Sequence, residues 1–499
     1  MSERSVETLP RRREEREKDA KSMLFFAFFA PSWLIFSILT SAALTGCGVD
    51  QKQEIATYRK VIDGNKPAPV HIAPDQVVTL TDAVKLAVQN EEQLSLLGEN
   101  YLQALISKDK AFVSFLPTVS FSSGWTYQSN GAVAPRHSQV FTGSIPGQWN
   151  LFNGFRDYYN LKATTQTIEQ QKQLIFDGEQ TVLLDVAQTY YTVLTNEQSV
   201  DVLANSLSAQ EANVQTLQEQ FRVGAARRLD VAQAEAQASQ TRVSLLQSQA
   251  NVKTSRAMLV YLVDAPIGNN PLRDDFVAPV AVGPQGRWIT DAEAGRQDLL
   301  AANAAVRAAR YNVEVAFGQF YPTIGFNLGY ELLDPPYQPG TMWNTVLNLN
   351  VPIYTAGSIW AQVRQAWSQY RSAALTQEQL KRQIDQNVQI AYVNLDLAHT
   401  ELAELEIEVI AARDEYYLAQ MLYKNGGGTY LNVLQAQATL LSTQLQLTTE
   451  QFAQKTAYFN LLRTAGKLSY ASLRSATRPS EQELRALATQ PVTQPSTQP

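Results

Sequence analysis

The side chains that could carry out covalent chemistry are few in this chain of 499 residues, and they are widely scattered. The three histidines, His71, His137 and His399, lie far apart in unlike sequence surroundings. No Ser/His/Asp setting, phosphate-binding loop or spacing of metal ligands accompanies them. The sequence therefore predicts no catalytic residue, no metal and no cofactor, and we do not expect an enzyme.

The charge balance is the next constraint on function. The chain has 41 Lys and Arg against 47 Asp and Glu, a net charge of -6, which argues against a nucleic-acid partner. Only 18% of the residues are charged. Carboxylates on the predicted helices are interpreted as lying on faces that are exposed to solvent or that form ion pairs between helices. The composition suits long helices that pack through small residues.

Cys47 is the single cysteine, so no disulfide can form within one chain. It follows a polar, basic segment, an apolar run from Met23 to Leu39 and a group of small residues. This order is typical of an export signal, and residues 1–46 are therefore excluded from the fold. Two alternatives remain open. The apolar run is nearly long enough to be an uncleaved transmembrane helix, and Met23 could be the true start.

The segment Leu44-Thr-Gly-Cys47 resembles the end of a bacterial lipoprotein signal. This resemblance implies that Cys47 is acylated, becomes the mature N-terminus and anchors the protein to lipid. The residue after Cys47 is Gly48 and not an aspartate. In this respect the segment resembles lipoproteins that are sent on to the outer membrane.

One stretch of the chain occurs twice, Phe115-Leu-Pro-Thr-Val-Ser-Phe-Ser-Ser-Gly-Trp125 and Phe320-Tyr-Pro-Thr-Ile-Gly-Phe-Asn-Leu-Gly-Tyr330. In each copy a helical pattern stops at a proline, because proline disfavours helix at the residue before it. A strict alternation of apolar with small or polar residues follows. That alternation predicts a transmembrane β-strand. A half-buried strand of a soluble sandwich is the alternative for either copy taken alone.

The remaining landmarks repeat in the same order. Pro117 and Pro322 are 205 residues apart, Gly154 and Gly357 are 203 apart, and Gly224 and Gly427 are 203 apart. Such regular offsets predict an internal duplication. The expected strands are 118–128, 139–151, 323–332 and 344–354. The expected helices are 79–115, 156–222, 229–262, 290–320, 357–424 and 430–464.

These elements divide the chain into a linker (47–78), a first repeat (79–264), an inter-repeat linker (265–289), a second repeat (290–466) and a low-complexity tail (467–499). The tail is expected to be disordered. A helix of about 65 residues is roughly 100 Å long, deeper than an ordinary globular core. Four strands cannot stand alone in a bilayer, because their open edges leave backbone groups unpaired. A closed ring of identical subunits would complete them. The fold class is therefore a transmembrane β-barrel continued by a long periplasmic α-helical barrel.

Both halves resemble the outer-membrane efflux protein family, whose best-known member is TolC. The matching stretches are Leu80-Thr-Asp-Ala-Val-Lys-Leu-Ala87, Phe115-Leu-Pro-Thr118, Leu151-Phe-Asn-Gly154, Gln220-Phe-Arg-Val-Gly-Ala225, Leu229-Asp-Val-Ala-Gln-Ala-Glu235, Val351-Pro-Ile-Tyr354 and Tyr430-Leu-Asn-Val-Leu-Gln-Ala436. The resemblance implies a homotrimer with four strands per protomer in one barrel. It also implies the exit duct of a tripartite efflux or secretion system, with a periplasmic adaptor and an inner-membrane transporter as partners. The lipoprotein-type signal fits the lipoprotein branch of the family.

The resemblance also indicates candidate site residues. Two turns between helices, Val223-Gly224-Ala225 and Gly426-Gly427-Gly428, are expected to contact the adaptor; simple turn chemistry is the alternative. Asp230, Asn432 and Gln435 are expected to form the constriction at the tunnel mouth. Because two of these three are amides where the family can place aspartates, we expect weak cation selectivity. Solvated charges at the tip are the alternative.

The remaining candidates lie near the strands. Pro117, Gly154, Pro322 and Gly357 are expected to form the strand–helix junctions. Trp125, Trp149, Trp343 and Tyr330 are expected either to form an aromatic girdle at the lipid interface or to pack at these junctions. Two other functional classes are alternatives. A periplasmic adaptor lipoprotein would have one hairpin between soluble β domains, and a structural coiled-coil lipoprotein of the envelope would have no alternating strands.

Overall fold

The computed structural model describes residues 50–63, 73, 76–90, 92–129, 137–279, 282–333, 343–470 and 472–473. Cys47, the signal segment, His71 and most of the C-terminal tail lie outside the described residues. The chain divides into two compact units, 1–57 and 58–499, and helix α2 (Gln51–Asp63) crosses the boundary between them. The description below concerns the second unit.

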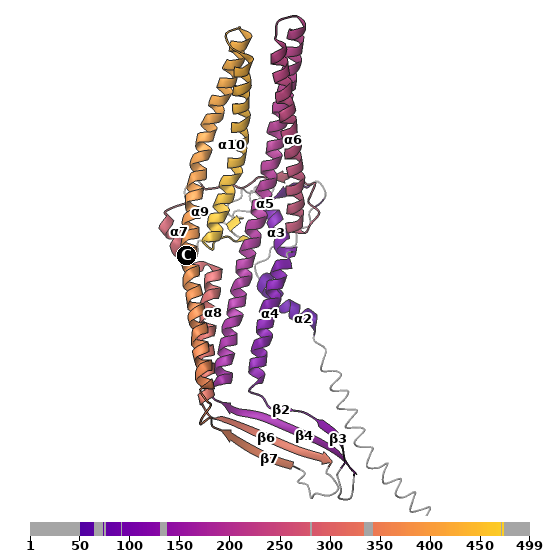
Figure 1. Cartoon of the computed structure of the whole chain (residues 1–499), viewed down its shortest axis with the longest axis vertical. Helices are drawn as coiled ribbons and strands as arrows, with labels where there is room; N and C mark the ends of the chain where they lie inside the picture. Colours follow the sequence, from indigo (N-terminus) through magenta and orange to yellow (C-terminus); the bar gives the residue numbers. More distant parts are fainter. Residues whose placement is uncertain are drawn as a thin grey trace, which may run out of the picture. The chain divides into compact units, whose positions relative to one another are not determined.

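The two repeats have matching helices (Figure 1). Helix α5 (Arg156–Arg222) and helix α9 (Ser358–Lys424) each have 67 residues and begin 202 positions apart. The returning helices α6 (Arg228–Val263) and α10 (Tyr430–Thr464) are also 202 positions apart at their starts. The predicted duplication is confirmed. The true offset is 202, however, so Gly224 matches Gly426 and not Gly427.

The first helix that leads into the strands is described in two parts, α3 (Leu80–Asn90) and α4 (Glu92–Val113), with residue 91 outside the described residues. The second is interrupted where a single helix was expected. It is divided into α7 (Gln285–Gly295) and α8 (Gln297–Phe317), since Arg296 has the extended conformation. A short 3-10 helix, η1 (Gly318–Phe320), then leads to the proline. Thr79, just before α3, caps the N-terminus of this helix. The Thr79 hydroxyl accepts a bond from the Asp82 amide (3.3 Å) and donates to its carboxylate (2.8 Å).

The strands form one antiparallel sheet at the end of α5 and α9 that lies away from the two helical turns (Figure 1). Strand β4 (His137–Asn153) pairs with β6 (Thr323–Leu333), and β6 pairs with β7 (Trp343–Asn350). On its other side, β4 pairs with both β2 (Thr118–Val119) and β3 (Ser122–Ser129). The sheet is therefore four strands wide, and β2/β3 and β7 are its open edges. The expected strand 344–354 ends early, at Asn350.

The strand register confirms the predicted alternation. One face carries Ile145, Tyr330 and Trp343 side by side, then Trp149, Phe326 and Leu347. The opposite face carries Asn150, Gly325 and Asn348 in one row. The apolar face is open in the protomer, and Trp343 and Leu347 remain 65% and 67% exposed. A sheet with one apolar open face and two open edges requires lipid and further strands to cover it.

The main core lies where the helices of the two repeats meet, about midway along α5 and α9. A pair of short parallel strands, β1 (Val78–Thr79) and β5 (Leu272–Arg273), was not predicted from the sequence. The buried Tyr190 hydroxyl links them, since its oxygen lies 2.8 Å from the Val78 carbonyl oxygen and accepts a bond from the Arg273 amide (3.1 Å).

Among the residues that the structure describes, no helix combines the length and the apolar character needed to cross a membrane.

Candidate functional site

The two helical turns have the same backbone geometry. Gly224 and Gly426 have φ values of +77° and +74°, which favour glycine because it has no Cβ. The amide of Ala225 donates to the Gln220 carbonyl (2.7 Å), and the amide of Gly427 donates to the Leu422 carbonyl (2.9 Å). These bonds close the ends of α5 and α9 in the usual glycine-terminated way. Helix termination at a positive φ therefore explains the presence of one glycine in each turn.

The sequence-predicted turn residues are also open to a partner. Val223 is 77% exposed, and Gly224 and Ala225 are exposed beside it. A Cβ added at Gly224 or at Gly426 would meet no atom within 4 Å. Turn geometry does not require an exposed valine. The exposure of Val223 is therefore not explained by turn formation, and it is the feature of this turn that suits contact with a partner.

The residues predicted for the tunnel mouth have different surroundings. The Asp230 side chain is only 2% exposed and accepts two bonds from the Arg227 guanidinium (2.9 and 3.2 Å). The Tyr423 hydroxyl, on α9, donates to the same carboxylate at 3.2 Å. Asn432 and Gln435 are exposed on the first turns of α10, where the Thr429 hydroxyl donates to Asn432 (2.7 Å). The structure does not bring the three residues together within one protomer.

Asp230 is instead part of a contact between the two hairpins, α5/α6 and α9/α10. Next to it, the Asn213 amide on α5 donates to the hydroxyl of Tyr430 on α10 (2.9 Å). The rings of Tyr423 and Tyr430 lie 5.3 Å apart; Tyr430 belongs to a small core with Leu217, and Tyr423 packs against that core. Burial raises the pKa of Tyr430 to about 12. Burial, and then the Asp230 carboxylate, raise the pKa of Tyr423 as well, so both hydroxyls remain donors at neutral pH.

The strand–helix junctions bring the two repeats together at the sheet end. Gly154 has φ +62°, and a Cβ added to it would lie 2.2 Å from the carbonyl oxygen of Gly318. Gly357 has φ +81° but open space around it. The indole nitrogen of Trp149 donates to the Phe115 carbonyl (2.9 Å), just before Pro117. Trp149 therefore contributes to a junction, whereas Trp125 and Trp343 are exposed at 68% and 65%.

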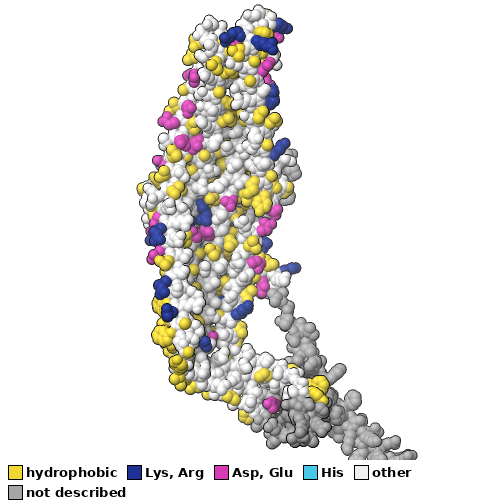
Figure 2. All heavy atoms as spheres, in the orientation of Figure 1, with side chains coloured by type: hydrophobic (Ala, Val, Ile, Leu, Met, Phe, Trp, Pro, Cys, Tyr) yellow, Lys and Arg dark blue, Asp and Glu magenta, His cyan; other side chains and the backbone are white. Residues whose placement is uncertain are grey.

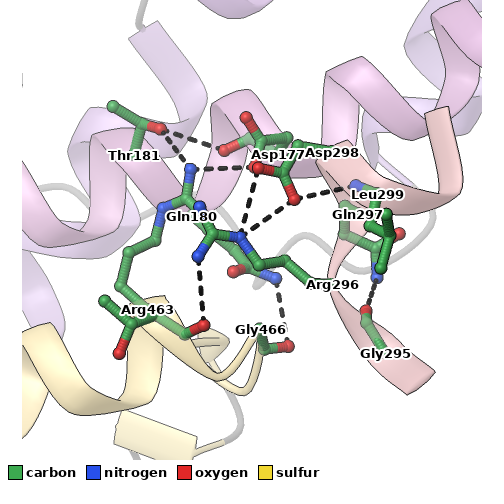
Figure 3. A network of polar contacts seen from close by, with 11 residues as sticks. Asp177, Gln180, Thr181, Gly295, Arg296, Gln297, Asp298, Leu299, Arg463 and Gly466 are labelled. Atoms are coloured by element: carbon green, nitrogen blue, oxygen red, sulfur yellow. Dashed lines mark hydrogen bonds and ion pairs between the residues drawn. The ribbon is translucent and has the colours of Figure 1, made fainter. Parts of the chain in front are cut away.

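A polar network that the sequence did not indicate joins the end of α10 to α5 and to the break between α7 and α8 (Figure 3). Arg463, near the end of α10, donates to Asp177 (2.8 Å) and Thr181 (3.1 Å) on α5. Arg296, at the break between α7 and α8, donates to the Thr464 carbonyl (3.2 Å). The network fixes the end of the second repeat to the middle helix of the first. Arg463 and Asp177 are 286 positions apart, and Arg296 and Thr464 are 168 apart, so no local pattern could have predicted these contacts.

The sequence matches the family described as outer membrane efflux protein over residues 103–263 and 288–467. The chain belongs to this family, and it is an outer-membrane channel component of an efflux system. It is 28% identical over 411 residues to the outer membrane efflux protein BepC of Brucella suis, covering 78% of this chain and 86% of that protein. It is 21% identical over 395 residues to the probable outer membrane lipoprotein SilC of Salmonella typhimurium, covering 76% and 84%.

Solved structures show the same fold. CusC matches with a TM-score of 0.70 and 17% identity, covering 81% of this chain and 97% of that chain. The Campylobacter jejuni CmeC outer membrane channel also matches with a TM-score of 0.70, at 16% identity, covering 79% and 88%. The predicted family, fold class, function and outer-membrane location are confirmed. The relatives named here are described as an outer membrane efflux protein, a probable outer membrane lipoprotein and channels, and none is described as an enzyme.

Proposed function

We propose that three copies of this chain form one channel, in which each copy gives four strands to a shared barrel in the outer membrane. The open edges of the sheet support this assembly, because β2/β3 and β7 each leave one row of backbone groups without a described partner. In hydrocarbon, each such group costs several kcal/mol unless another strand pairs with it. The long helices of the three copies continue the barrel as one tunnel in the periplasm.

The channel is a passive exit for substrates that an inner-membrane transporter delivers through a periplasmic adaptor. The exposed turn around Val223 and the glycine-rich turn Gly426-Gly427-Gly428 are the proposed adaptor contacts. Both turns lie at the helix ends farthest from the sheet (Figure 1). An exposed valine with small neighbours offers the backbone approach that another helical hairpin needs.

The tunnel mouth is held narrow by the contact between the hairpins. Asp230 stabilises it from α6 through Tyr423, and Asn432 and Gln435 supply neutral polar groups on α10. Cys47 is the proposed site of lipid attachment, supported by Leu44-Thr-Gly-Cys47 and by the likeness to SilC, itself named a lipoprotein. The proposed repeat boundaries remain 79–264 and 290–466.

The test combines assembly and conductance of the full-length protein. Purified from outer-membrane fractions in mild detergent, it should have the mass of a trimer that dissociates on heating. In a planar lipid bilayer, it should give ion currents that increase when Tyr423→Phe weakens the hairpin contact. A monomer, or a protein released from membranes by carbonate, would instead support the adaptor or the structural coiled coil. A trimer whose Tyr423→Phe variant still passes no current would reject the channel.

A further inference from the structure

Helix α4 contains a glycine at a position where helix formation disfavours one. Gly98 is buried in the interior of this helix, although glycine is the least favourable helix residue apart from proline. A Cβ added to Gly98 would collide with the ring of Tyr58, 2.8 Å from its Cε2 atom. The missing side chain therefore makes room for a tyrosine that belongs to helix α2.

Tyr58 fills this space on α4, which we call the Gly98 notch and define by Gly98 and Glu99. The tyrosine side chain is only 4% exposed. Burial raises the pKa of its hydroxyl, and a hydrogen bond to the Glu99 carboxylate raises it as well, so the hydroxyl remains a donor at neutral pH. A buried aromatic ring whose hydroxyl has a partner is a strong local anchor.

Helix α2 has little else to hold it. Among its described side chains Tyr58 is the one that is buried, and most of the others are exposed, including Ile55 at 38%. The helix has 13 residues, and an isolated helix of this length is marginal in water. We therefore expect α2 to remain folded only while Tyr58 occupies the Gly98 notch.

The notch lies on a helix at one edge of a layer. Near the sheet, α4 packs against α5, α5 against α8 and α8 against α9, while near the turns the order is α6, α5, α10 and α9 (Figure 1). Helix α9 thus forms one edge of the helical layer, and α4 and α6 form the other. Gly98 is 15 residues before the end of α4 at Val113, about 23 Å along the helix.

The change from helix to sheet coincides with a loss of charge. Glu331 is the only Asp, Glu, Lys or Arg in the described strands. On the face shown in Figure 2, charged side chains follow the helical part and are scarce on the sheet. The apolar row of Phe152, Ile324 and Leu349 is the last one before the helices. Acyl chains on Cys47 would therefore enter the bilayer near the level at which α4 ends.

The chain between Tyr58 and Cys47 is just long enough to reach this level. Gln51 and Tyr58 are seven residues apart in α2, about 10 Å. The four residues from Cys47 to Gln51 add about 14 Å when fully extended. The Asp50 carboxylate accepts a bond from the Lys52 amide (3.1 Å), which caps the start of the helix. The greatest span is thus about 24 Å, close to the distance between the notch and the end of α4.

We propose that the Gly98 notch is a docking site for Tyr58, and that α2 is a spacer of fixed length that holds the acylated Cys47 at the membrane surface. This inference rests on the lipid attachment proposed above and specifies its mechanical role. A slack tether would only keep the protein near the membrane. A tether without slack also fixes the height of the helical part relative to the lipid.

Hydrogen exchange of the full-length protein in lipid nanodiscs tests the docking. Tyr58→Ala should make the backbone amides of α2 exchange roughly tenfold faster or more, because an undocked α2 unfolds. Ile55→Ala, on the same helix, is the matched control and should stay within about twofold of the parent. Gly98→Leu should also expel the ring, while α4 itself gains helix propensity. Unchanged exchange of α2 in Tyr58→Ala and Gly98→Leu would reject the docking.

Shortening α2 tests the length of the spacer. Deleting residues 52–55 removes about one turn, roughly 6 Å, and keeps Asp50 and Tyr58. The lipid and the notch should then compete, so α2 should exchange roughly tenfold faster in the acylated protein than in Cys47→Ser exported with a signal peptide that is cleaved without acylation. With α2 at full length, the two forms should agree within about twofold. An equal rate in both shortened forms would mean a slack tether and reject the spacer.

Mass spectrometry of the mature N-terminus separates this inference from the lipid attachment on which it rests. A Cys47 without acyl chains would reject the attachment and the spacer together, whatever the exchange of α2. An acylated, conducting trimer whose α2 exchange responds neither to Tyr58→Ala nor to the deletion would reject the docking and the spacer, and leave the channel intact.

Discussion

The hydroxyl of Tyr423 on α9 donates a 3.2 Å hydrogen bond to the buried carboxylate of Asp230 on α6, although 193 positions separate the two residues. Asp230 is already paired with Arg227, the residue just before its own helix, so the tyrosine adds a bond to a fixed acceptor. The bond joins the two hairpins close to their turns. The width of the proposed tunnel mouth then depends on whether this bond is made.

Removing the hydroxyl should therefore open the channel. In Tyr423→Phe the ring contact with Tyr430 remains, but the bond to a charged acceptor is lost, at a cost of about 1.5–3 kcal/mol. We expect the fraction of time in the conducting state to rise by about tenfold or more in planar bilayers. Tyr417→Phe is the matched control, since Tyr417 lies on the same helix and is 60% exposed. Equal conductance in the two variants would show that the bond does not restrict the mouth.

The two junction glycines should respond differently to alanine. Both have positive φ, which costs a non-glycine residue about 1–2 kcal/mol. At Gly154 the new Cβ would also collide with the Gly318 carbonyl, which adds about 1–3 kcal/mol, whereas Gly357 has open space. Gly154→Ala should thus lower the dissociation temperature of the trimer clearly more than Gly357→Ala does. Equal losses would mean that backbone strain alone decides both positions.

Glu450 should make stability depend on pH. It lines a groove of about 570 Å³ between α9 and α10 together with Glu401, Glu404 and Glu408. Burial, and then the charge of Glu401, raise the pKa of Glu450 above its usual value of 4.5. The folded state therefore holds its proton more tightly than the unfolded state, and stability falls as pH rises through the interval above 4.5.

Glu450→Gln should remove this dependence. The variant should be more stable than the parent at pH 7, and the difference should vanish below pH 4.5. Thermal unfolding across this pH range measures the effect. Glu415→Gln, an exposed carboxylate on α9, is the control and should follow the parent at every pH. A Glu450→Gln variant that is less stable at pH 7 would contradict the argument.

Ion selectivity should be weak and easy to strengthen. Asn432 and Gln435 are exposed neutral amides, and the charge of Asp230 is already balanced by Arg227. The double variant Asn432→Asp with Gln435→Asp should raise the preference for cations several-fold at low salt, because exposed carboxylates are poorly screened there. Reversal potentials across a salt gradient measure this. A strong cation preference that persists in Asn432→Ala and Gln435→Ala would place the selective charge elsewhere.

The duplication and the element order could be predicted because prolines and glycines mark them. Pro117 and Pro322 end helices for a local steric reason, and the alternation after them is visible in about ten residues. At the helical turns the offset was one residue too large because Gly426-Gly427-Gly428 offers three glycines, and only the backbone shows that Gly426 has the left-handed conformation of Gly224.

The contacts that bring the hairpins and the repeats together could not be predicted. Asp230 was expected to form part of the constriction at the tunnel mouth, but nothing near it in the sequence indicates that Tyr423 is its partner. Arg463 and Asp177 are ordinary helix residues until the two repeats are packed. The break at Arg296 was missed for the same reason, since its guanidinium bonds to Thr464, far along the chain.

The two edges of the helical layer are different surfaces carried by every copy, α6 on one side and α9 on the other (Figure 1). In the proposed ring, a copy with a damaged α6 edge would keep an intact α9 edge, and it would still bind one neighbour but leave the ring open. Co-expressing such a copy with the normal protein should therefore inactivate the mixed assemblies. Export through the channel would then fall further than the dose of normal protein accounts for.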